Sequence, residues 1–248
     1  MFLREGHVEH SIPQLRKFIQ QNPLGILTTA IESDDHPFIQ SSHIPWVIDI
    51  PDPEDEKALP TLRGHIARKN PQSKVFTAEA LRSEEPVSKP HTIKRDVMVL
   101  FNGPVHHYVT PKFYTKTKPE SGKVVPTWNY SAVEAHGTAT VYLDHKSPST
   151  TAFLSKQIRD LSHEAETRIM GYSKPWAVED APEKYIELLA ANIVGVEIEV
   201  KRLGGKFKMS QEIGREDVEG VVEGFAGLGT EEGKRMAEIV RERDGLRA

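Results

Sequence analysis

Short β-type segments, separated by clusters of proline, glycine and acidic residues, recur through the first 143 residues of the chain. Residues 24–31 and 38–48 predict a β-hairpin. Further strands are expected at 62–67, 97–101, 105–110 and 124–143. Interleaved strands of this kind favour a barrel with peripheral helices over a doubly wound parallel sheet.

Helical patterns lie on both sides of this strand-rich part. Residues 11–23 predict a short amphipathic helix, because Ser11 is a favourable N-cap and Pro23 ends the pattern. Further helices are expected at 149–165, at 182–191 and, in two stretches around a glycine break, at 216–243. Most of the predicted helices therefore follow residue 143, and one precedes the first strand.

Two long loops and a second hairpin complete the expected layout. An acidic, proline-rich loop is expected at 49–60, and a second loop with little periodicity at 74–95, a length that is usually functional or mobile. Residues 192–200 alternate apolar and polar side chains, and Gly204-Gly205 and the segment 206–209 follow them. This pattern predicts a hairpin.

The composition excludes several classes of protein. The 248 residues contain no cysteine, so the chain has no thiol nucleophile, disulfide framework or cysteine-ligated metal centre. A net charge of -4 disfavours strong DNA binding, because neutralising phosphates needs an excess of Lys and Arg. The charged N-terminus predicts no secretory signal, and no segment is apolar enough to predict a membrane span, so we expect a cytoplasmic or nuclear protein.

The familiar catalytic fingerprints are also missing. We find no G-x-G-x-x-G after a strand, no P-loop, no G-x-S-x-G elbow and no H-E-x-x-H. His106 and His107 are adjacent, and neighbours in a strand point to opposite faces, as ordinary strand histidines do. The chemistry must therefore be sought in less specific clusters.

The first such cluster contains Arg68, Lys69 and Asn70 at the end of a predicted strand. Exposed backbone N–H groups and a guanidinium at a strand end can hold a phosphate, which suits an anionic ligand. A solvated strand end with surface cations would show the same residues. Both interpretations stay open at this point.

Two more clusters have the same ambiguity. Trp128 and Tyr130 flank Asn129, a composition suited to stacking on a planar ring, although a core tryptophan is an equal alternative. The third cluster comprises Lys206, Lys208 and Ser210. If these residues share a strand face, they could present cations and a hydroxyl to phosphate, but a plain exposed face fits equally well.

These clusters belong to a longer series of motifs that resembles the PaiB family, FMN-binding negative transcriptional regulators with the split-barrel fold of pyridoxamine-phosphate oxidases. The series includes Gly-His-Ile-Ala-Arg at 64–68, Val-Pro-Thr-Trp-Asn-Tyr at 125–130 and Lys-Phe-Lys-Met-Ser-Gln at 206–211. Its other members lie at 25–27, 42–45, 70–71, 101–104, 108–111, 114, 136–137, 175–176 and 193–198. Each motif is weak alone, and their shared order makes the resemblance specific.

The resemblance implies an α+β protein built on a six-stranded split β-barrel with peripheral helices. The barrel domain is expected at 1–211, with a helical insertion around 149–191, and a helical C-terminal extension at 212–248. It further implies a homodimer with FMN at the subunit interface. The loops at 49–60 and 74–95 depart from the bacterial pattern, and either one would alter ligand access if it covered the cleft.

The implied cofactor site draws on both halves of the chain. The strand that carries Ser42 and His43, together with residues 64–70, would face the phosphate and the isoalloxazine, and Trp128 and Tyr130 would shape the ring pocket. The residues expected to bind the cofactor are Ser42, His43, His65, Ala67, Arg68, Lys69, Asn70, Trp128, Asn129, Tyr130, Lys208 and Ser210. The sequence identifies no catalytic residue and no metal site.

Three functions are compatible with these expectations. The first is a flavin-binding protein, either an FMN-dependent oxidoreductase or a ligand-responsive regulator, in which His43 or His65 donates a proton. The second is a cofactor-free transcriptional regulator or interaction module, although no helix-turn-helix with a basic recognition helix is evident. The third is a haem-binding or haem-degrading split barrel with His43, His65, His106 or His136 as axial ligand.

Overall fold

Within residues 1–245, which the computed structural model describes, six strands of six or more residues form the main sheet. They are β2 (Leu24–Ala30), β3 (Ile39–Pro45), β5 (Thr61–Ala67), β7 (Val97–Asn102), β9 (Thr127–Tyr142) and β10 (Ile193–Lys208). The shorter strands are β1 (Val8–Glu9), β4 (Val47–Asp49), β6 (His91–Thr92) and β8 (His107–Val109). The strand order β3-β2-β7-β9-β10-β5-β4 and the flanking helices confirm the predicted α+β barrel class.

Helices make up most of the remaining regular structure. The α-helices are α1 (Ile12–Gln21), α2 (Pro71–Leu81), α3 (Thr117–Ser121), α4 (Pro148–Glu164), α5 (Glu183–Ala190), α6 (Arg215–Ala226) and α7 (Glu231–Gly245). Short helical turns are η1 (Glu5–His7), η2 (Pro111–Phe113), η3 (Ala165–Ile169) and η4 (Val178–Asp180). No helix in the described part of the chain is long and apolar enough to cross a membrane.

The chain divides into two compact units. The barrel unit comprises Ile19–Phe101 and Ala135–Leu203, and the terminal unit comprises Met1–Phe18, Asn102–Glu134 and the chain from Gly204 onward. The 16-residue strands β9 and β10 contribute residues to both units. Each unit has its own core.

In the barrel unit the sheet curls, so that strands from opposite ends of the order meet. Four strands separate β3 from β5 in the order, yet a methyl group added at Gly64 of β5 would lie 2.8 Å from Ile44 Cγ2 of β3. Burial alternates along β2, as expected for a strand with one face on a core. The buried interior contains Leu27, Ile44, Leu62, Val99, Phe101, Val141, Val196 and Ile198.

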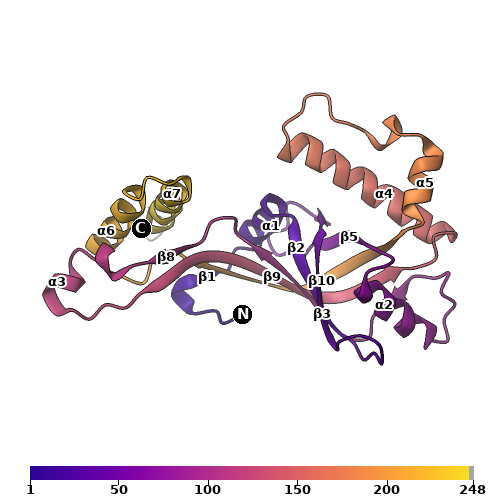
Figure 1. The fold of residues 1–248 in the computed structure, drawn as a ribbon, viewed down its shortest axis with the longest axis horizontal. Coiled ribbons are helices and arrows are strands. Elements are labelled where there is room, and N and C mark those ends of the chain that lie inside the picture. The colour runs from indigo at the N-terminus through magenta and orange to yellow at the C-terminus, as the bar shows by residue number, and fades with distance from the viewer. Residues whose placement is uncertain (246–248) are drawn as a thin grey trace. The chain divides into compact units, whose positions relative to one another are not determined.

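Helix α4 covers the outer face of β5 (Figure 1). Asp160 of α4 accepts a hydrogen bond from Arg63 Nη2 at 2.7 Å, and Gln157 Oε1 lies 2.6 Å from His65 Nδ1. Arg63 and His65 alternate with the inward-facing residues of β5, so both side chains reach the helix. The polar contacts therefore fasten α4 to the barrel wall.

In the terminal unit, α6 and α7 pack against each other beside β8 (Figure 1). The buried residues of this core are Val105, Val109, Tyr114, Met209, Val218, Val221, Val222, Phe225, Met236, Ala237 and Val240. Asp217, in the first turn of α6, accepts hydrogen bonds from the backbone N–H groups of Lys116 and Thr117 and from Thr117 Oγ1. Burial would raise the pKa of Asp217, but these bonds outweigh it and lower the pKa.

The prediction of a loop at 74–95 is wrong for its first part, because helix α2 extends to Leu81. Asn70 caps this helix, since its side chain accepts a hydrogen bond from the backbone N–H of Gln72 at 2.8 Å, and Pro71 occupies the first turn. Val75 and Phe76 are fully buried and fasten the helix to the core. Tertiary burial of α2 thus outweighs its weak apolar periodicity.

The hairpin expected at Gly204-Gly205 is also wrong, because β10 runs without interruption from Ile193 to Lys208. A methyl group added at Gly205 would collide with Leu15 Cδ2 of α1. The glycine therefore allows a helix side chain to approach the strand closely, and it does not mark a turn.

Candidate functional site

Two of the predicted cofactor residues lie on β3 in the barrel unit. Ser42 is half-buried, and its Oγ accepts a hydrogen bond from Asn70 Nδ2 at 3.1 Å. His43 is exposed and faces the other side of the strand. The N-cap of α2 is therefore fastened to the strand beside His43, and exposed Lys69 directly precedes this cap.

Two other predicted residues point away from this cluster into internal contacts. Arg68 donates from Nε to the carbonyl of Ala191 at 3.0 Å and from Nη2 to the carbonyl of Ile193 at 2.9 Å. These bonds tie the end of β5 to the junction between α5 and β10. The imidazole of His65 is hydrogen-bonded to Gln157 of α4, and Ala67 is exposed at the strand end.

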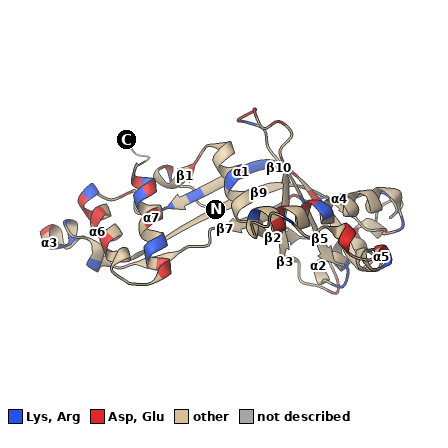
Figure 2. Ribbon diagram, turned by 90° about the horizontal axis from the view of Figure 1, so that it is seen from above, with Lys and Arg blue, Asp and Glu red and all other residues tan. Residues whose placement is uncertain are grey.

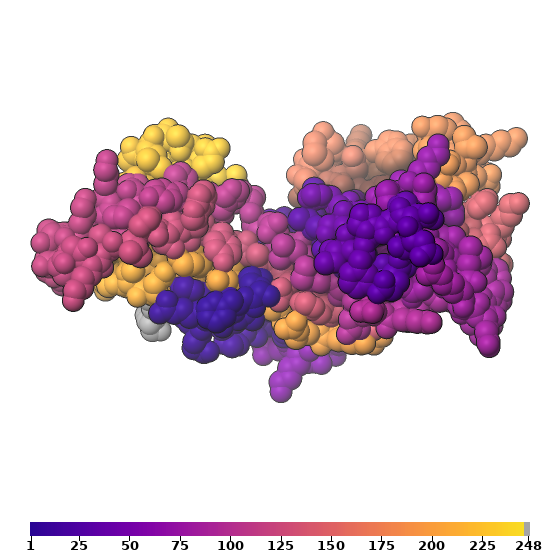
Figure 3. Space-filling model, turned by 60° about the horizontal axis from the view of Figure 1, so that its bottom comes forward, coloured from indigo at the N-terminus to yellow at the C-terminus, as the bar shows by residue number. Residues whose placement is uncertain are grey.

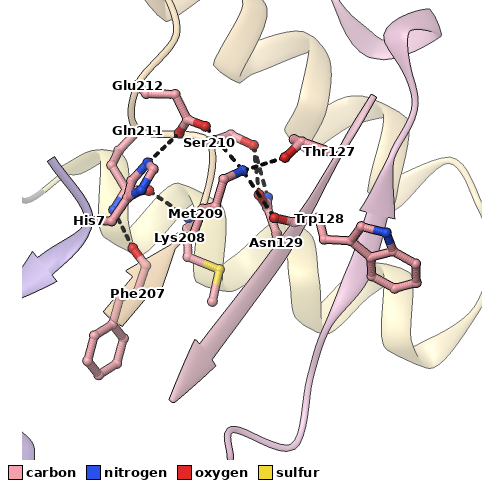
Figure 4. Close-up of polar contacts among 10 residues, drawn as sticks. All are labelled: His7, Thr127, Trp128, Asn129, Phe207, Lys208, Met209, Ser210, Gln211 and Glu212. Atoms are coloured by element: carbon pink, nitrogen blue, oxygen red, sulfur yellow. Dashed lines mark hydrogen bonds and ion pairs between the residues drawn. The ribbon is translucent and has the colours of Figure 1, made fainter. Parts of the chain in front are cut away.

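In the terminal unit, Lys208 is surrounded by acceptors (Figure 4). Its Nζ donates to Thr127 Oγ1 at 2.7 Å and to the carbonyl of Trp128 at 3.1 Å, and it lies 3.2 Å from Glu212 Oε1. The second carboxylate oxygen of Glu212 lies 3.1 Å from His7 Nε2. Burial would raise the pKa of Glu212, but a backbone hydrogen bond and the Lys208 ammonium outweigh it and lower the pKa.

Asn129 and Ser210 form a buried pair in the same region (Figure 4). Asn129 Nδ2 lies 2.9 Å from Ser210 Oγ, which lies 3.1 Å from Asn129 Oδ1. Ser210 has a left-handed backbone with φ of 63°, an uncommon conformation for a residue other than glycine. The expected strand face shared by Lys206, Lys208 and Ser210 is wrong, because β10 ends at Lys208 and Ser210 lies in the following turn.

The aromatic residues of the predicted site lie at the surface of the terminal unit. Trp128 is 53% exposed, so the alternative of a core tryptophan is wrong, and its ring makes an edge contact with Tyr108 at 6.0 Å between centroids. Tyr130 instead stacks beneath the ammonium of Lys206, which lies 5.4 Å from the ring centroid. The two rings thus have different partners.

The histidines considered as haem ligands lie on different elements. His43 is exposed on β3, His65 faces α4, and His136 is half-buried on β9. His106 belongs to the terminal unit, where its ring lies 6.3 Å from that of Trp128. The predicted site residues thus separate into a barrel-unit group at 42–70 and a terminal-unit group at 128–210.

A further surface in the barrel unit escaped the sequence prediction. Antiparallel pairing sets Ile26 opposite His43 and Leu100, and Thr28 opposite Ser41 and Met98, so these side chains share one face. We call this face the outer β-face, and it comprises Ile26, Thr28, Ser41, His43, Met98 and Leu100. Thr28 Oγ1 and Ser41 Oγ lie 3.0 Å apart. The short apolar segment at 24–31 was the available signal for β2, but only the register places β7 beside it.

The outer β-face is accessible. Leu24 and Ile39, which flank it on β2 and β3, are 58% and 64% exposed. The space-filling view shows the indigo and violet β2–β3 region at the surface of the barrel unit (Figure 3). An exposed sheet face that combines hydroxyl groups, an imidazole and apolar side chains can receive an amphipathic planar ligand.

Residues 1–202 match the family described as "Putative FMN-binding domain". The chain belongs to this family. It is 26% identical over 231 residues to the protease synthase and sporulation protein PAI 2 of Bacillus subtilis, and the match covers 93% of this chain and 91% of the relative. These matches confirm the resemblance to the PaiB family.

Similarity to other proteins extends over the whole chain. An uncharacterized protein of Aspergillus fumigatus is 56% identical over 259 residues, with 100% of this chain and 99% of the relative covered. Among solved structures, a conserved hypothetical protein from Mycobacterium tuberculosis is similar at 13% identity and a TM-score of 0.47, covering 87% of this chain and 95% of that one.

The outer β-face offers several of the groups that a flavin-binding site uses. A flavin presents a planar ring with hydrogen-bonding edges and a phosphate, and this face offers apolar Ile26 and Leu100 beside the hydroxyls of Thr28 and Ser41 and the imidazole of His43. Lys208 and Ser210 are already engaged by Glu212 and Asn129. The barrel unit therefore supplies the better match to the family's cofactor.

Proposed function

We propose that this protein binds FMN on the outer β-face and uses it either for redox chemistry on a small substrate or for ligand-responsive regulation. The observation that carries the proposal is the open sheet face, on which hydroxyls and an imidazole adjoin apolar side chains. The bound flavin would supply the redox chemistry, and the protein would position it.

Each residue of the proposed site has a distinct role. His43 supplies a hydrogen bond for the phosphate, and Ile26 and Leu100 supply apolar surface for the ring. Asn70 holds the start of α2 against Ser42, on the opposite side of β3 from His43, so Asn70 and Lys69 are not assigned to the outer β-face. In this proposal Arg68 is a structural residue, because its guanidinium is bonded to two backbone carbonyls.

We also propose that a second copy of the chain covers this sheet face, which makes the functional form a homodimer. The strongly exposed Leu24 and Ile39 at its margin support this proposal, because exposed apolar clusters commonly mark interfaces. Sedimentation equilibrium tests it, and a monomer at all concentrations would contradict it. The variant Ile39→Glu is expected to shift the equilibrium towards monomer.

A flavin titration tests the cofactor proposal. The purified protein should quench FMN fluorescence, and His43→Ala should weaken binding about tenfold, the loss expected for one or two hydrogen bonds. His163→Ala, an exposed histidine on α4, is the matched control and should leave the affinity unchanged. Trp128→Ala tests the terminal-unit group directly.

The outcomes separate the two groups of residues. If His43→Ala and Ser41→Ala bind FMN like the unmodified protein, the outer β-face is not the site. A loss confined to Trp128→Ala would move the site to the terminal unit. The absence of any FMN binding would reject the flavin function itself.

A further inference from the structure

The barrel unit contains a cavity of about 670 Å³ between α4, α5 and the η4 turn. This volume lies within the range of roughly 300 to 1,000 Å³ that is usual for small-molecule sites. The cavity lies on the helical insertion and shares no residue with the outer β-face, so it is independent of the proposed flavin site.

The walls of the cavity include one face of α4 and one face of α5. Leu154, Ser155 and Ile158 lie on one side of α4, and Ile186 and Ala190 face them from α5, each set at the three-to-four-residue spacing of one helix face. Leu154 is buried, whereas Ile158 and Ile186 are half-buried. The small side chains of Ser155 and Ala190 leave part of the space between the helices unfilled, so an apolar surface stays accessible.

The charge on the cavity wall is unbalanced. Arg159 also lines the cavity, but its Nε lies 2.8 Å from Glu179 Oε1. This guanidinium is therefore already paired with a carboxylate. Glu183 and Glu187 also line it, one helical turn apart on α5, and no cationic side chain of the described residues lies within ion-pair distance of either. Figure 2 shows acidic positions on α5. Like charges at this spacing repel each other, and a bound cation would relieve the repulsion.

We propose that this cavity binds a small organic cation with an apolar body. Its ammonium group lies against Glu183 and Glu187, and its apolar part lies on Leu154, Ile158 and Ile186. The one guanidinium and three carboxylates of the wall give a net negative surface, which disfavours anionic ligands of the same shape. The site holds its ligand without covalent chemistry.

A matched series of probes tests this proposal on the full chain: 4-phenylbutylammonium, 4-phenylbutanol and 4-phenylbutanoate. They share an apolar body and differ in charge. The methyl NMR signals of Ile158 and Ile186, assigned with single Ile→Val variants, report occupancy of the cavity. The ammonium probe is expected to shift both signals and to bind about tenfold more tightly than the carboxylate probe, the effect of two exposed ion pairs.

The double variant Glu183→Gln, Glu187→Gln should remove this preference. The matched control is Glu219→Gln, Glu223→Gln on α6, which carries two exposed carboxylates at the same spacing away from the cavity and should keep the preference. Ala190→Leu fills the apolar wall and should weaken both the ammonium and the alcohol probes. The proposal is overturned if no probe shifts the two methyl signals, if the carboxylate probe binds as tightly as the ammonium probe, or if the Glu183, Glu187 variant keeps the preference.

Discussion

Arg63 joins three elements of the barrel unit through one guanidinium, and the cost of removing it can be worked out. Its side chain is 4% exposed, and it donates to both carboxylate oxygens of Asp49, the last residue of β4, and to Asp160 of α4 at 2.7 Å. Burial alone would lower the pKa of Arg63, but the hydrogen bonds to Asp49 and Asp160 outweigh it and raise the pKa. The guanidinium therefore stays charged.

The variant Arg63→Ala leaves two carboxylates without their shared cation. Removing one partner of a buried ion pair costs about 3–5 kcal/mol. The Asp49 and Asp160 side chains are 43% and 32% exposed, so water recovers part of this loss. We therefore expect the free energy of unfolding to fall by roughly 2–3 kcal/mol, which for a chain of this size lowers the melting temperature by about 5–10 °C.

Urea unfolding followed by tryptophan fluorescence measures this loss. Trp46 is 1% exposed within the barrel unit, whereas Trp128 and Trp176 are 53% and 44% exposed, so the change in emission reports chiefly on the barrel. Lys156→Ala is the matched control, because Lys156 pairs with the same Asp160 at 2.5 Å but is 62% exposed. This control should cost less than about 0.5 kcal/mol.

The same variant changes the pH dependence of stability. Burial would raise the pKa of Asp160, but hydrogen bonds from Lys156 and Arg63 outweigh it and lower the pKa. A lowered folded-state pKa contributes stability above the unfolded value of about 3.9, and this contribution is lost as the pH falls through the folded pKa. Arg63→Ala should therefore lose less stability below about pH 4 than the unmodified chain. Two results would refute the reasoning. One is a loss of unfolding free energy under about 0.5 kcal/mol at pH 7, and the other is a double-mutant cycle with Asp160→Asn that shows no coupling energy.

Three further variants test other parts of the structure. Asn129→Ala removes both hydrogen bonds to Ser210, which holds a left-handed backbone, and should cost about 2 kcal/mol in urea unfolding; an unchanged midpoint would contradict this. Gly137→Ala places a methyl group against the backbone carbonyl of Glu199, so the melting temperature should fall by several degrees, roughly the effect of 1–3 kcal/mol of overpacking. An unchanged value would count against this close approach of Gly137 to β10. Asp217→Asn removes a carboxylate whose pKa is lowered, so unfolding curves from pH 7 to pH 3 should become flatter, and a steeper acid limb would oppose the assignment.

Local patterns in the sequence were sufficient to predict most of the elements. A short apolar run at 24–31, bounded by Pro23 and a turn cluster, predicted β2, and the N-cap serine and proline boundaries at 11–23 predicted α1. The helices α4 and α5 follow a strong three-to-four-residue spacing of apolar side chains. These signals depend on residues close together in the chain, so no tertiary information was needed.

The elements that were predicted wrongly depend on packing between distant segments. Helix α2 has little amphipathic spacing, and it forms because Val75 and Phe76 are buried by the barrel. The glycine at 205 has the sequence appearance of a turn, and its role became visible only when Leu15 was placed against it. In both cases tertiary contacts outweighed the local preference.

By itself the sequence determined the residue types of the candidate site, the order of the family motifs and the α+β class. Only the tertiary structure decided which of those side chains are engaged within the protein. Arg68 donates to carbonyls 123 and 125 residues away in the sequence, and His65 contacts Gln157, which is 92 residues away. These contacts join elements that no local sequence pattern connects. The outer β-face and the cavity between α4 and α5 likewise arise from strand register and helix packing, because a surface exists only once distant segments have been brought together.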